Sequence, residues 1–307
     1  MDSMTWPELA YDDWKATKET LHRYTQIVGK VRMALMPPRN HWWHVTLLVS
    51  PDGVTTGPMP YGDHTVEIEF DVVHQRMRFR SSEGRHALFP LRGPLPVARF
   101  HEQVFEALRS IGVRVAIDAR PFDLGESPAF AVDEAHREYD SEAVERWWRI
   151  LRHTDHTLAR FASRFNGKAS PAHLFWHSFD LAHARFSGRP APAADGLDPI
   201  SADAYSHELI AFGWWPGDAR TTPFPAYYSY TAPEPAALIE RELRPDEADW
   251  QAAGSGSLAI LPYDSVRASA DPAATLLDFF ESAYRAGAGS AGWDIEALAT
   301  AHAPDGA

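Results

Sequence analysis

Two alternating segments, at residues 64–73 and 76–80, constrain the fold more than any other feature of the chain. In HTVEIEFDVV and RMRFR, apolar residues stand at every second position and mostly charged residues fill the positions between them. A period of two places one face of each strand on a core and the other in solvent, as in an antiparallel hairpin. If residues 74 and 75 form a tight turn, opposite charges pair across the solvated face, and the expected pairs are Asp71 with Arg78 and Glu69 with Arg80.

The rest of the chain adds runs of helices and runs of strands in place of a strict alternation of the two. Apolar residues spaced three and four apart predict helices at 11–35, 97–111, 141–165 and 271–289. Aromatic and β-branched runs bounded by turn residues predict strands at 41–50, 87–91, 113–118, 207–217, 226–232 and 258–264. This order favours an α+β fold in which mostly antiparallel β-sheets pack with several long helices.

The segment RPFDLGESPAF, residues 120–130, contains Pro and Gly and is the best candidate for a boundary within the chain. We therefore expect two similar-sized α+β halves that share an interface, at residues 1–125 and 126–295. The last residues, 296–307, are expected to form a frayed tail.

The composition excludes several classes of function. The chain has 307 residues and a net charge of −13, whereas a protein that binds nucleic acid through its phosphates needs clustered basic residues. It contains no cysteine, so any metal would be held by carboxylates and by the 15 histidines. Neither GxGxxG nor GxxxxGK followed by Ser or Thr occurs, so no nucleotide cofactor is expected.

The sequence also indicates the cellular compartment in which the protein is expected. The segment MDSMTWPELAYDDWK has neither a basic stretch nor an apolar stretch, and no run in the chain approaches the roughly 18 apolar residues of a membrane helix. We therefore expect a cytoplasmic protein without a membrane partner. The abundance of Ala, Arg and Pro suggests a GC-rich bacterial genome.

The segment SPAHLFWHSFDLAHARFSG, residues 170–188, combines aromatic residues with imidazoles and a carboxylate. Ser170 suits a helix N-cap, Pro171 the first helical position and Gly188 the residue after the last turn, so we expect a helix. At about 100° per residue, one narrow stripe of that helix carries His173, His177 and Asp180. Histidines four residues apart on a helix can bind one metal ion, and a buried polar network of the same groups is the alternative.

Two further clusters could complete a site with this helix. NHWWHV holds His41 and His44 at the start of an expected strand, and YSHEL holds His207 and Glu208 at the start of another. Asp180 and Glu208 are the candidate catalytic carboxylates, as metal ligands or as a general base. We predict a divalent metal site whose ligands come from His41, His44, His173, His177 and His207.

The ligand types and the aromatic surroundings suggest a class of reaction. Imidazole and carboxylate suit iron, copper, zinc or manganese, and a dry aromatic pocket favours an oxidative reaction of iron or copper with O₂ over hydrolysis. The substrate would be a small molecule, anionic or aromatic, that contacts Arg185, Arg189, Trp43 and Trp176. Two alternatives stay open: a metal-free protein that binds or senses a small molecule, and an interaction protein with structurally packed histidines.

Motifs spread along the chain resemble those of a bacterial family known only as a domain of unknown function. They are WPEL, QIVGK, HWWHVTL, PYGD, SPAHLFWHSFDLAHARFSGR, YSHE and LPYDSVR, and they run from about residue 5 to about residue 290. The resemblance shifts the emphasis in the 170–188 segment from His177 to His173 and Asp180. The resemblance implies no particular reaction. The residues that it places within motifs of the family are His41, His44, His173, Asp180, Arg185, Arg189, His207 and Glu208.

Overall fold

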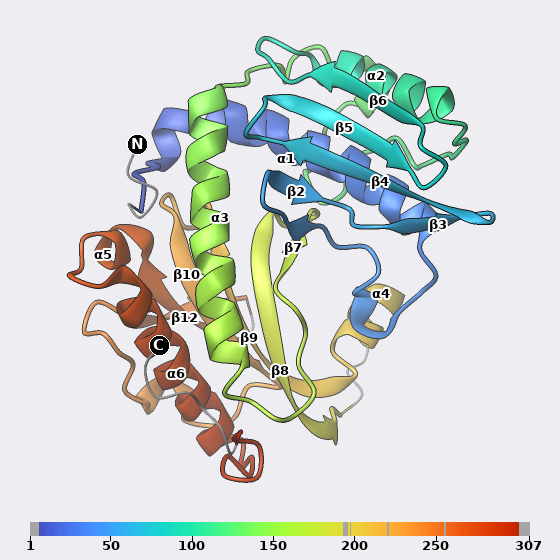
Figure 1. Cartoon of the computed structure of the whole chain (residues 1–307). Coiled ribbons are helices and arrows are strands. Elements are labelled where there is room, and N and C mark those ends of the chain that lie inside the picture. The colour runs from blue at the N-terminus through green and yellow to red at the C-terminus, as the bar shows by residue number, and fades with distance from the viewer. Residues whose placement is uncertain (1–5, 193–195, 197, 220, 255, 301–307) are drawn as a thin grey trace.

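The structure is a computed structural model that describes residues 6–192, 196, 198–219, 221–254 and 256–300. Four long helices agree with the expected ones: α1 (Tyr11–Leu35), α2 (Val97–Ser110), α3 (Ser141–Ala162) and α6 (Pro272–Ser290). Two short helices, α4 (Pro199–Ala204) and α5 (Tyr263–Arg267), are additional. The helices pack against two antiparallel sheets, which confirms the α+β prediction (Figure 1). None of the helices in the described ranges has both the length and the apolar run that a membrane crossing requires.

The first sheet contains six strands. In sheet order these are β1 (Leu48–Val49), β2 (Gly53–Thr55), β4 (His64–Asp71), β5 (Arg76–Ser81) and β6 (His86–Pro90), and β3 (Met59–Tyr61) pairs with the beginning of β4. Helices α1 and α2 pack against this sheet, and its buried side chains include Ile68, Phe70 and Phe79. The alternation at residues 64–73 and 76–80 is therefore confirmed as an antiparallel hairpin.

The charge pairs across this hairpin differ by two positions from the expected ones. The observed pairs are Asp71 with Arg76, Glu69 with Arg78 and Glu67 with Arg80. The expected register was wrong because residues 72–75 form a four-residue turn, in which the Asp71 carboxylate accepts hydrogen bonds from the backbone and the ring of His74. The ladder of opposite charges is itself confirmed.

The second sheet also contains six strands. Their order is β11 (Asp249–Ala253), β12 (Gly256–Pro262), β10 (Ala226–Ala232), β9 (His207–Trp215), β8 (Asp180–Pro190) and β7 (His173–Phe175). Helices α3, α5 and α6 pack against it, and alternate residues of β9 and β10, such as Phe212, Trp214 and Tyr227, are buried in the core on that side. The other face of β8 and β9 carries small residues, namely Ala182, Ala184, Ala211 and Gly213.

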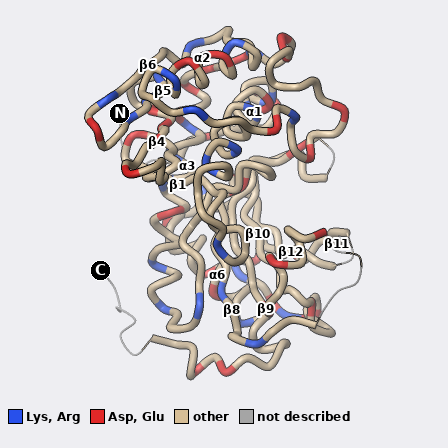
Figure 2. The backbone as a smooth tube through the Cα atoms, turned by 90° about the vertical axis from the view of Figure 1, so that its right-hand side faces the viewer, with Lys and Arg blue, Asp and Glu red and all other residues tan. Residues whose placement is uncertain are grey.

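The two sheets share one continuous hydrophobic core. The backbones of Leu47 and Leu174 exchange two hydrogen bonds of 2.9 Å, which bring the chain before β1 next to β7. Helix α3 contacts strands of both sheets and runs down alongside the second one (Figure 1). Figure 2 shows the two sheets one above the other, with acidic and basic residues interspersed over both parts of the molecule. The division of the chain near residue 125 stays a prediction.

Three expected elements differ in the structure. Within residues 41–50 the strand is confined to β1, and the chain before it makes a 3-10 helix, η1 (Asn40–Trp42). Residues 113–118 are irregular backbone that follows α2. The expected helix at 170–188 is the strand pair β7 and β8. Two further 3-10 helices are η2 (Phe130–Val132) and η3 (Leu238–Glu240).

The expected tail, residues 296–307, is described as far as residue 300, and residues 301–307 lie outside the described part of the chain. The described portion contacts the segment that follows α3. The carbonyl oxygen of Leu298 accepts a 2.8 Å hydrogen bond from the Asn166 amide, and the Thr300 amide donates to the Arg164 carbonyl oxygen at 3.2 Å.

Candidate ligand-binding cavity

The segment that we expected to be a helix is a β-hairpin, and this correction changes which of its side chains lie together. β7 and β8 pair in antiparallel register, and residues 176–179 form the connecting turn. A 2.7 Å hydrogen bond from the Phe179 amide to the Phe175 carbonyl oxygen closes this turn. Gly188 has a φ of 87° and lies in a bulge of β8, so it does not end a helix. The predicted helical stripe is therefore wrong, and its members occupy β7, the turn and the start of β8 as His173, His177 and Asp180 respectively.

Helix α1 fixes the turn that carries His177. The Nε2 atom of His22 lies 3.0 Å from the carbonyl oxygens of both Trp176 and His177, so it donates to this pair. Burial lowers the pKa of His22 to about 3, which keeps the ring neutral. Gly29 leaves room for the Trp176 indole, whose Cδ1 would lie 2.1 Å from an added Cβ, and the indole Nε1 donates to the Val45 carbonyl oxygen at 2.7 Å. The QIVGK and HLFWHSF motifs thus form one packed unit.

A cavity of about 710 Å³ opens on the face of the second sheet opposite the helix-covered face. Its floor consists largely of small or aliphatic residues of β8, β9, β10 and β12. Its walls come from the turn between β7 and β8, the segment around η1, helix α4 and β11. Small floor residues leave space that larger side chains would fill, so these strands keep the cavity open. The aromatic side chains of the lining are Trp43, Phe175, Phe186, Tyr205, Trp215, Tyr228 and Tyr230.

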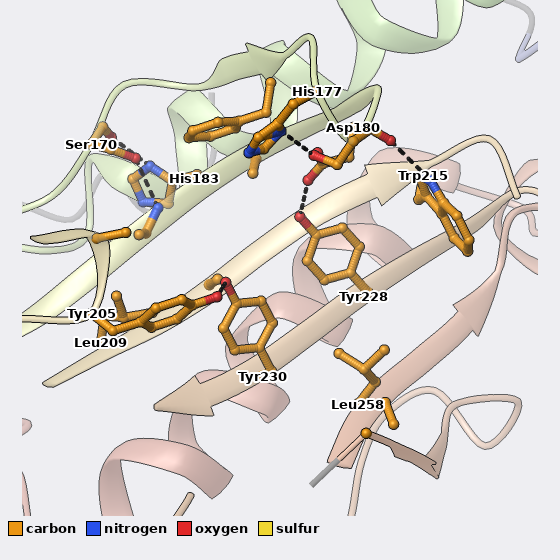
Figure 3. Close-up of a pocket in the computed structure, with 18 of the residues that line it drawn as sticks. Ser170, His177, Asp180, His183, Tyr205, Leu209, Trp215, Tyr228, Tyr230 and Leu258 are labelled. Atoms are coloured by element: carbon orange, nitrogen blue, oxygen red, sulfur yellow. Dashed lines mark hydrogen bonds between the residues drawn. The ribbon is translucent and has the colours of Figure 1, made fainter. Parts of the chain in front are cut away.

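The Asp180 carboxylate is the centre of a hydrogen-bond network at one end of the cavity (Figure 3). The hydroxyl groups of Tyr228 and Ser178 donate to its two oxygens. The Nδ1 atom of His177 lies 2.9 Å from Ser178 Oγ. Because the single hydroxyl proton of Ser178 points at the carboxylate, Ser178 Oγ accepts from the Nδ1–H of His177. Two hydroxyl donors are therefore directed at Asp180, a residue that is 9% exposed, and His177 supports one of them.

The sequence of β9 makes room for the Tyr228 ring. Gly213 lies between Ala182 of β8 and Tyr228 of β10, and an added Cβ at this position would lie 2.6 Å from the Tyr228 hydroxyl oxygen. The missing side chain lets the phenol cross the floor from β10 to Asp180 at the start of β8 (Figure 3). Burial raises the pKa of Tyr228 well above its ordinary value, so the phenol stays a hydrogen-bond donor at neutral pH.

His177 lines the cavity as a neutral imidazole. Burial lowers the pKa of His177, and the nearby charge of Asp180 opposes this effect. The ring stacks on Phe175 and Phe122, with centroid distances of 5.7 and 5.9 Å. Phe122 belongs to the loop after residue 119, and the Gln26 side chain of α1 bonds its backbone N–H and carbonyl at 2.7 and 2.9 Å. Helix α1 therefore supports His177 from two sides.

A second polar group lies at the other end of the cavity, where Phe186 of β8 lines it. The Nε2 atom of His41 accepts a 2.6 Å hydrogen bond from the Lys168 ammonium group, and Nδ1 donates to the Ala204 carbonyl oxygen at 3.2 Å. Lys168 Nζ also lies 4.9 Å from the centroid of the Phe186 ring. Burial and the Lys168 charge lower the pKa of His41, so the imidazole is neutral. His41 has a φ of 56°, a strained conformation that is enriched at functional sites.

The histidines that we predicted as metal ligands do not converge on one point. His41 and His207 are neighbours, with ring centroids 5.6 Å apart. His177 lies in the turn, and His44 accepts a backbone hydrogen bond from the segment before η1. Burial lowers the pKa of His173 to about 4. In the described part of the chain, no group of three or more His, Asp or Glu side chains could hold a metal ion.

Neither arginine that we predicted to bind substrate lines the cavity. Arg185 is buried on the opposite face of β8, where it donates to the Phe161 carbonyl oxygen and stacks on the rings of Phe161 and Tyr284. Arg189 forms two charged hydrogen bonds with Glu208, at 2.8 and 2.7 Å, and donates to the backbone that follows α6. Both arginines therefore hold elements of the fold together, and Glu208 is engaged in an ion pair.

The cavity lining overlaps only in part with the residues predicted from the sequence. Trp176 packs on α1 behind the turn, and the predicted residues that do line the cavity are His41, Trp43, His177 and Asp180. Residues that the sequence reasoning did not assign to a site are Ser178, Tyr205, Trp215, Tyr228 and Tyr230. Residues 226–232 were expected to form a strand, but this pattern does not show which of its aromatic rings face a cavity. The pairing of β8, β9 and β10 brings its first cavity-facing tyrosine to Asp180, and no local pattern shows this pairing.

The chain belongs to a family whose function is unknown. The family described as "Family of unknown function (DUF5996)" matches residues 6–300, nearly the whole chain. This match confirms the resemblance to a family of unknown function. No curated protein and no solved structure matches the chain.

Proposed function

We propose that the protein binds a small organic molecule in the cavity on the open face of the second sheet and does so with its own side chains. The observation that carries this proposal is the cavity of about 710 Å³, which combines aromatic walls with the Asp180 network at one end. Binding sites for small molecules are typically concave and largely apolar, with a few precisely placed polar groups. The cavity has the volume and the lining of such a site.

The polar groups at the Asp180 end are held in place before any ligand enters. Gly213 admits the ring of Tyr228, and α1 holds the turn of His177 through the hydrogen bonds of His22. Groups that are already positioned lose little conformational entropy on binding, which favours affinity. This preorganisation supports a binding site over a cluster of histidines that merely fill the core.

A metal-dependent oxidative enzyme, which we expected from the sequence, stays a prediction. Its expected ligands lie in separate places, and the described residues provide no group of three that could hold an ion. The metal-free alternative requires no such convergence, and for this reason it is the function that we propose. A cytoplasmic location and a bacterial origin stay predictions as well.

A variant that fills the cavity tests the proposal. Ala211 lies on the cavity floor between Ala184 and Tyr230, so Ala211→Phe places a ring in the space that a ligand would occupy. Saturation-transfer NMR is recorded for the wild type and the variant with a panel of single-ring aromatic compounds that carry positive, neutral or negative groups. We expect compounds that bind the wild type and lose this binding in Ala211→Phe.

A matched variant controls for the added ring. Ala270 is exposed and does not line the cavity, so Ala270→Phe should retain the wild-type binding pattern. Thermal unfolding of both variants shows whether they fold. The proposal is overturned if no compound in the panel binds the wild type, or if the compounds that bind do so equally well in folded Ala211→Phe.

A further inference from the structure

We propose that the occupant of the cavity is an organic cation, an amine or a quaternary ammonium group on an apolar body, and that Asp180 is its counter-ion. This inference rests on the proposed small-molecule function and adds the charge of the ligand. It replaces our expectation of an anionic ligand, since Arg185 and Arg189, on which that expectation depended, lie outside the cavity lining.

Asp180 is a buried carboxylate whose charge the described residues do not neutralise. It is 9% exposed, it forms no ion pair with a described Lys, Arg or His, and its partners are the hydroxyls of Ser178 and Tyr228. A carboxylate has about four acceptor positions, so about two remain for a ligand. Because a buried charge without an opposite charge is unfavourable, a cationic ligand supplies what the surrounding side chains lack.

The groups around Asp180 orient the carboxylate without compensating its charge. Tyr228 and Ser178 are neutral hydroxyl donors, and Ser178 in turn accepts from His177. Burial lowers the pKa of His177, so this imidazole adds no positive charge at neutral pH. The hydroxyl proton of Ser178 is directed at the carboxylate, so the serine serves here as an orienting donor.

The cavity is electrically polarised along β8. Its described lining contains no Lys or Arg, and Asp180 is the one Asp or Glu among the described lining residues. Lys168 lies over Phe186, which is six residues beyond Asp180 on β8 and therefore about 20 Å away along an extended strand. A ligand cation is thus attracted to the Asp180 end of the cavity.

Aromatic rings beside Asp180 add a second attraction for a cation. Phe175 lies opposite Asp180 in the β7–β8 pair, and Figure 3 shows Tyr228 and Trp215 beside the carboxylate. A 3.2 Å hydrogen bond from the Trp215 Nε1 to the Ser178 carbonyl oxygen anchors that indole. Faces of aromatic rings attract ammonium groups within roughly 6 Å of the ring centroid. The same rings and carboxylate provide no positive charge that would attract a ligand carboxylate or phosphate.

Three compounds with one framework and three charges test the inference. 2-Phenylethylamine is a cation at pH 7, 2-phenylethanol is its neutral counterpart and phenylacetate is its anionic counterpart. Calorimetric titration of the full chain at pH 7 measures the affinity of each. We expect the amine to bind at least about 10-fold more tightly than the alcohol, because a charge-assisted hydrogen bond to a buried carboxylate contributes that much affinity. We expect phenylacetate to bind most weakly of the three.

Substitutions at the carboxylate test the assignment to Asp180. Asp180→Asn removes the charge and keeps the shape, so the affinity for the amine should fall about 10- to 100-fold and that for the alcohol less than about twofold. Asp12→Asn is the matched control, because it removes the same charge from a side chain of α1 that is 83% exposed. Tyr228→Phe keeps the Asp180 charge, so the preference for the amine over the alcohol should persist in it.

The outcomes separate this inference from the proposed function. If the alcohol or phenylacetate binds at least as tightly as the amine, and Ala211→Phe abolishes that binding, the cavity is a binding site and the inference of a cation is overturned. If folded Asp180→Asn keeps the wild-type preference for the amine, the counter-ion assignment is overturned. If none of the three compounds binds, the inference fails, and the wider compound panel decides the proposed function on its own.

Discussion

The indole of Trp176 lies directly against the backbone of Gly29, a contact that joins the turn at the cavity to the C-terminal half of α1. An added Cβ on Gly29 would lie between 2.1 and 2.4 Å from three atoms of the indole. The same turn presents His177 and Ser178 to the Asp180 carboxylate. The position of the candidate site therefore depends on a glycine in the first helix of the chain.

Gly29→Ala tests this dependence. Alanine is normally favoured over glycine within a helix, but here the methyl group would displace a buried indole. We expect the free energy of unfolding to fall by about 1–3 kcal/mol, the usual effect of overpacking a core, in urea unfolding measurements. The matched control is Gly289→Ala in α6, where no atom lies within 4 Å of an added Cβ. The control should be neutral or stabilising, and equal effects of the two substitutions would contradict the packing that we describe.

Gln26→Leu tests the attachment of the loop that carries Phe122. The Gln26 amide bonds both backbone polar groups of Phe122, so the substitution leaves both without this partner and loosens the loop. We expect a loss of about 1–3 kcal/mol in local stability and faster chymotrypsin cleavage after Phe122, followed by mass spectrometry. Gln103→Leu is the control, since the Gln103 Oε1 atom is buried without a hydrogen-bond partner. An unchanged cleavage rate in Gln26→Leu would show that the loop is held by other contacts.

Arg185→Ala distinguishes a structural arginine from one that binds a ligand. The guanidinium of Arg185 lies 3.4 Å from the centroid of the Phe161 ring, on the face of β8 opposite the cavity. Removing this buried side chain should lower the free energy of unfolding by about 2–4 kcal/mol, in the range of other large-to-alanine changes in cores. The affinity for 2-phenylethylamine should change less than about twofold, which calorimetry measures. A selective loss of phenylacetate binding would instead restore the expectation of an anionic ligand.

Acid should destabilise the protein through its buried histidines. Burial lowers the pKa of His22 and His183 to about 3 and that of His173 to about 4, against an ordinary value near 6.5. At a pH between the lowered and the ordinary pKa, the unfolded chain binds protons that the folded chain does not. The free energy of unfolding therefore has its full contribution from these histidines above pH 6.5 and falls as the pH decreases towards 4. Each such imidazole contributes at most about 1.4 kcal/mol per pH unit.

Urea unfolding at pH 7.5, 6 and 5 measures this slope. In His22→Gln, whose amide can still donate to the turn, the decrease between pH 6 and pH 5 should be shallower than in the wild type. A free energy of unfolding that stays constant or rises between pH 7.5 and pH 5 would show that these imidazoles accept protons in the folded state.

Local sequence patterns predicted the elements whose signals are themselves local. The four long helices follow from apolar spacing, and the hairpin of β4 and β5 follows from strict alternation. The register of that hairpin was wrong because the Asp71 side chain stabilises a longer turn, an interaction that alternation does not encode.

The 170–188 segment shows why the candidate site was harder to predict. Ser170, Pro171 and Gly188 resemble helix caps, but the backbone of this segment is satisfied by partners far away in the sequence, in β9 and at Leu47. Asp180 was singled out from the sequence, and the structure places it in the lining of the cavity. Its partner Tyr228 could not be inferred, since their contact depends on three strands pairing and on a glycine between them.

A crystal structure of the chain with 2-phenylethylamine tests the central claim most directly. The account predicts the compound in the cavity, with its ring among the aromatic walls and its nitrogen roughly 2.7–2.9 Å from an oxygen of Asp180. A crystal in which the compound occupies another part of the surface, or lies in the cavity with its nitrogen turned away from Asp180, would contradict it.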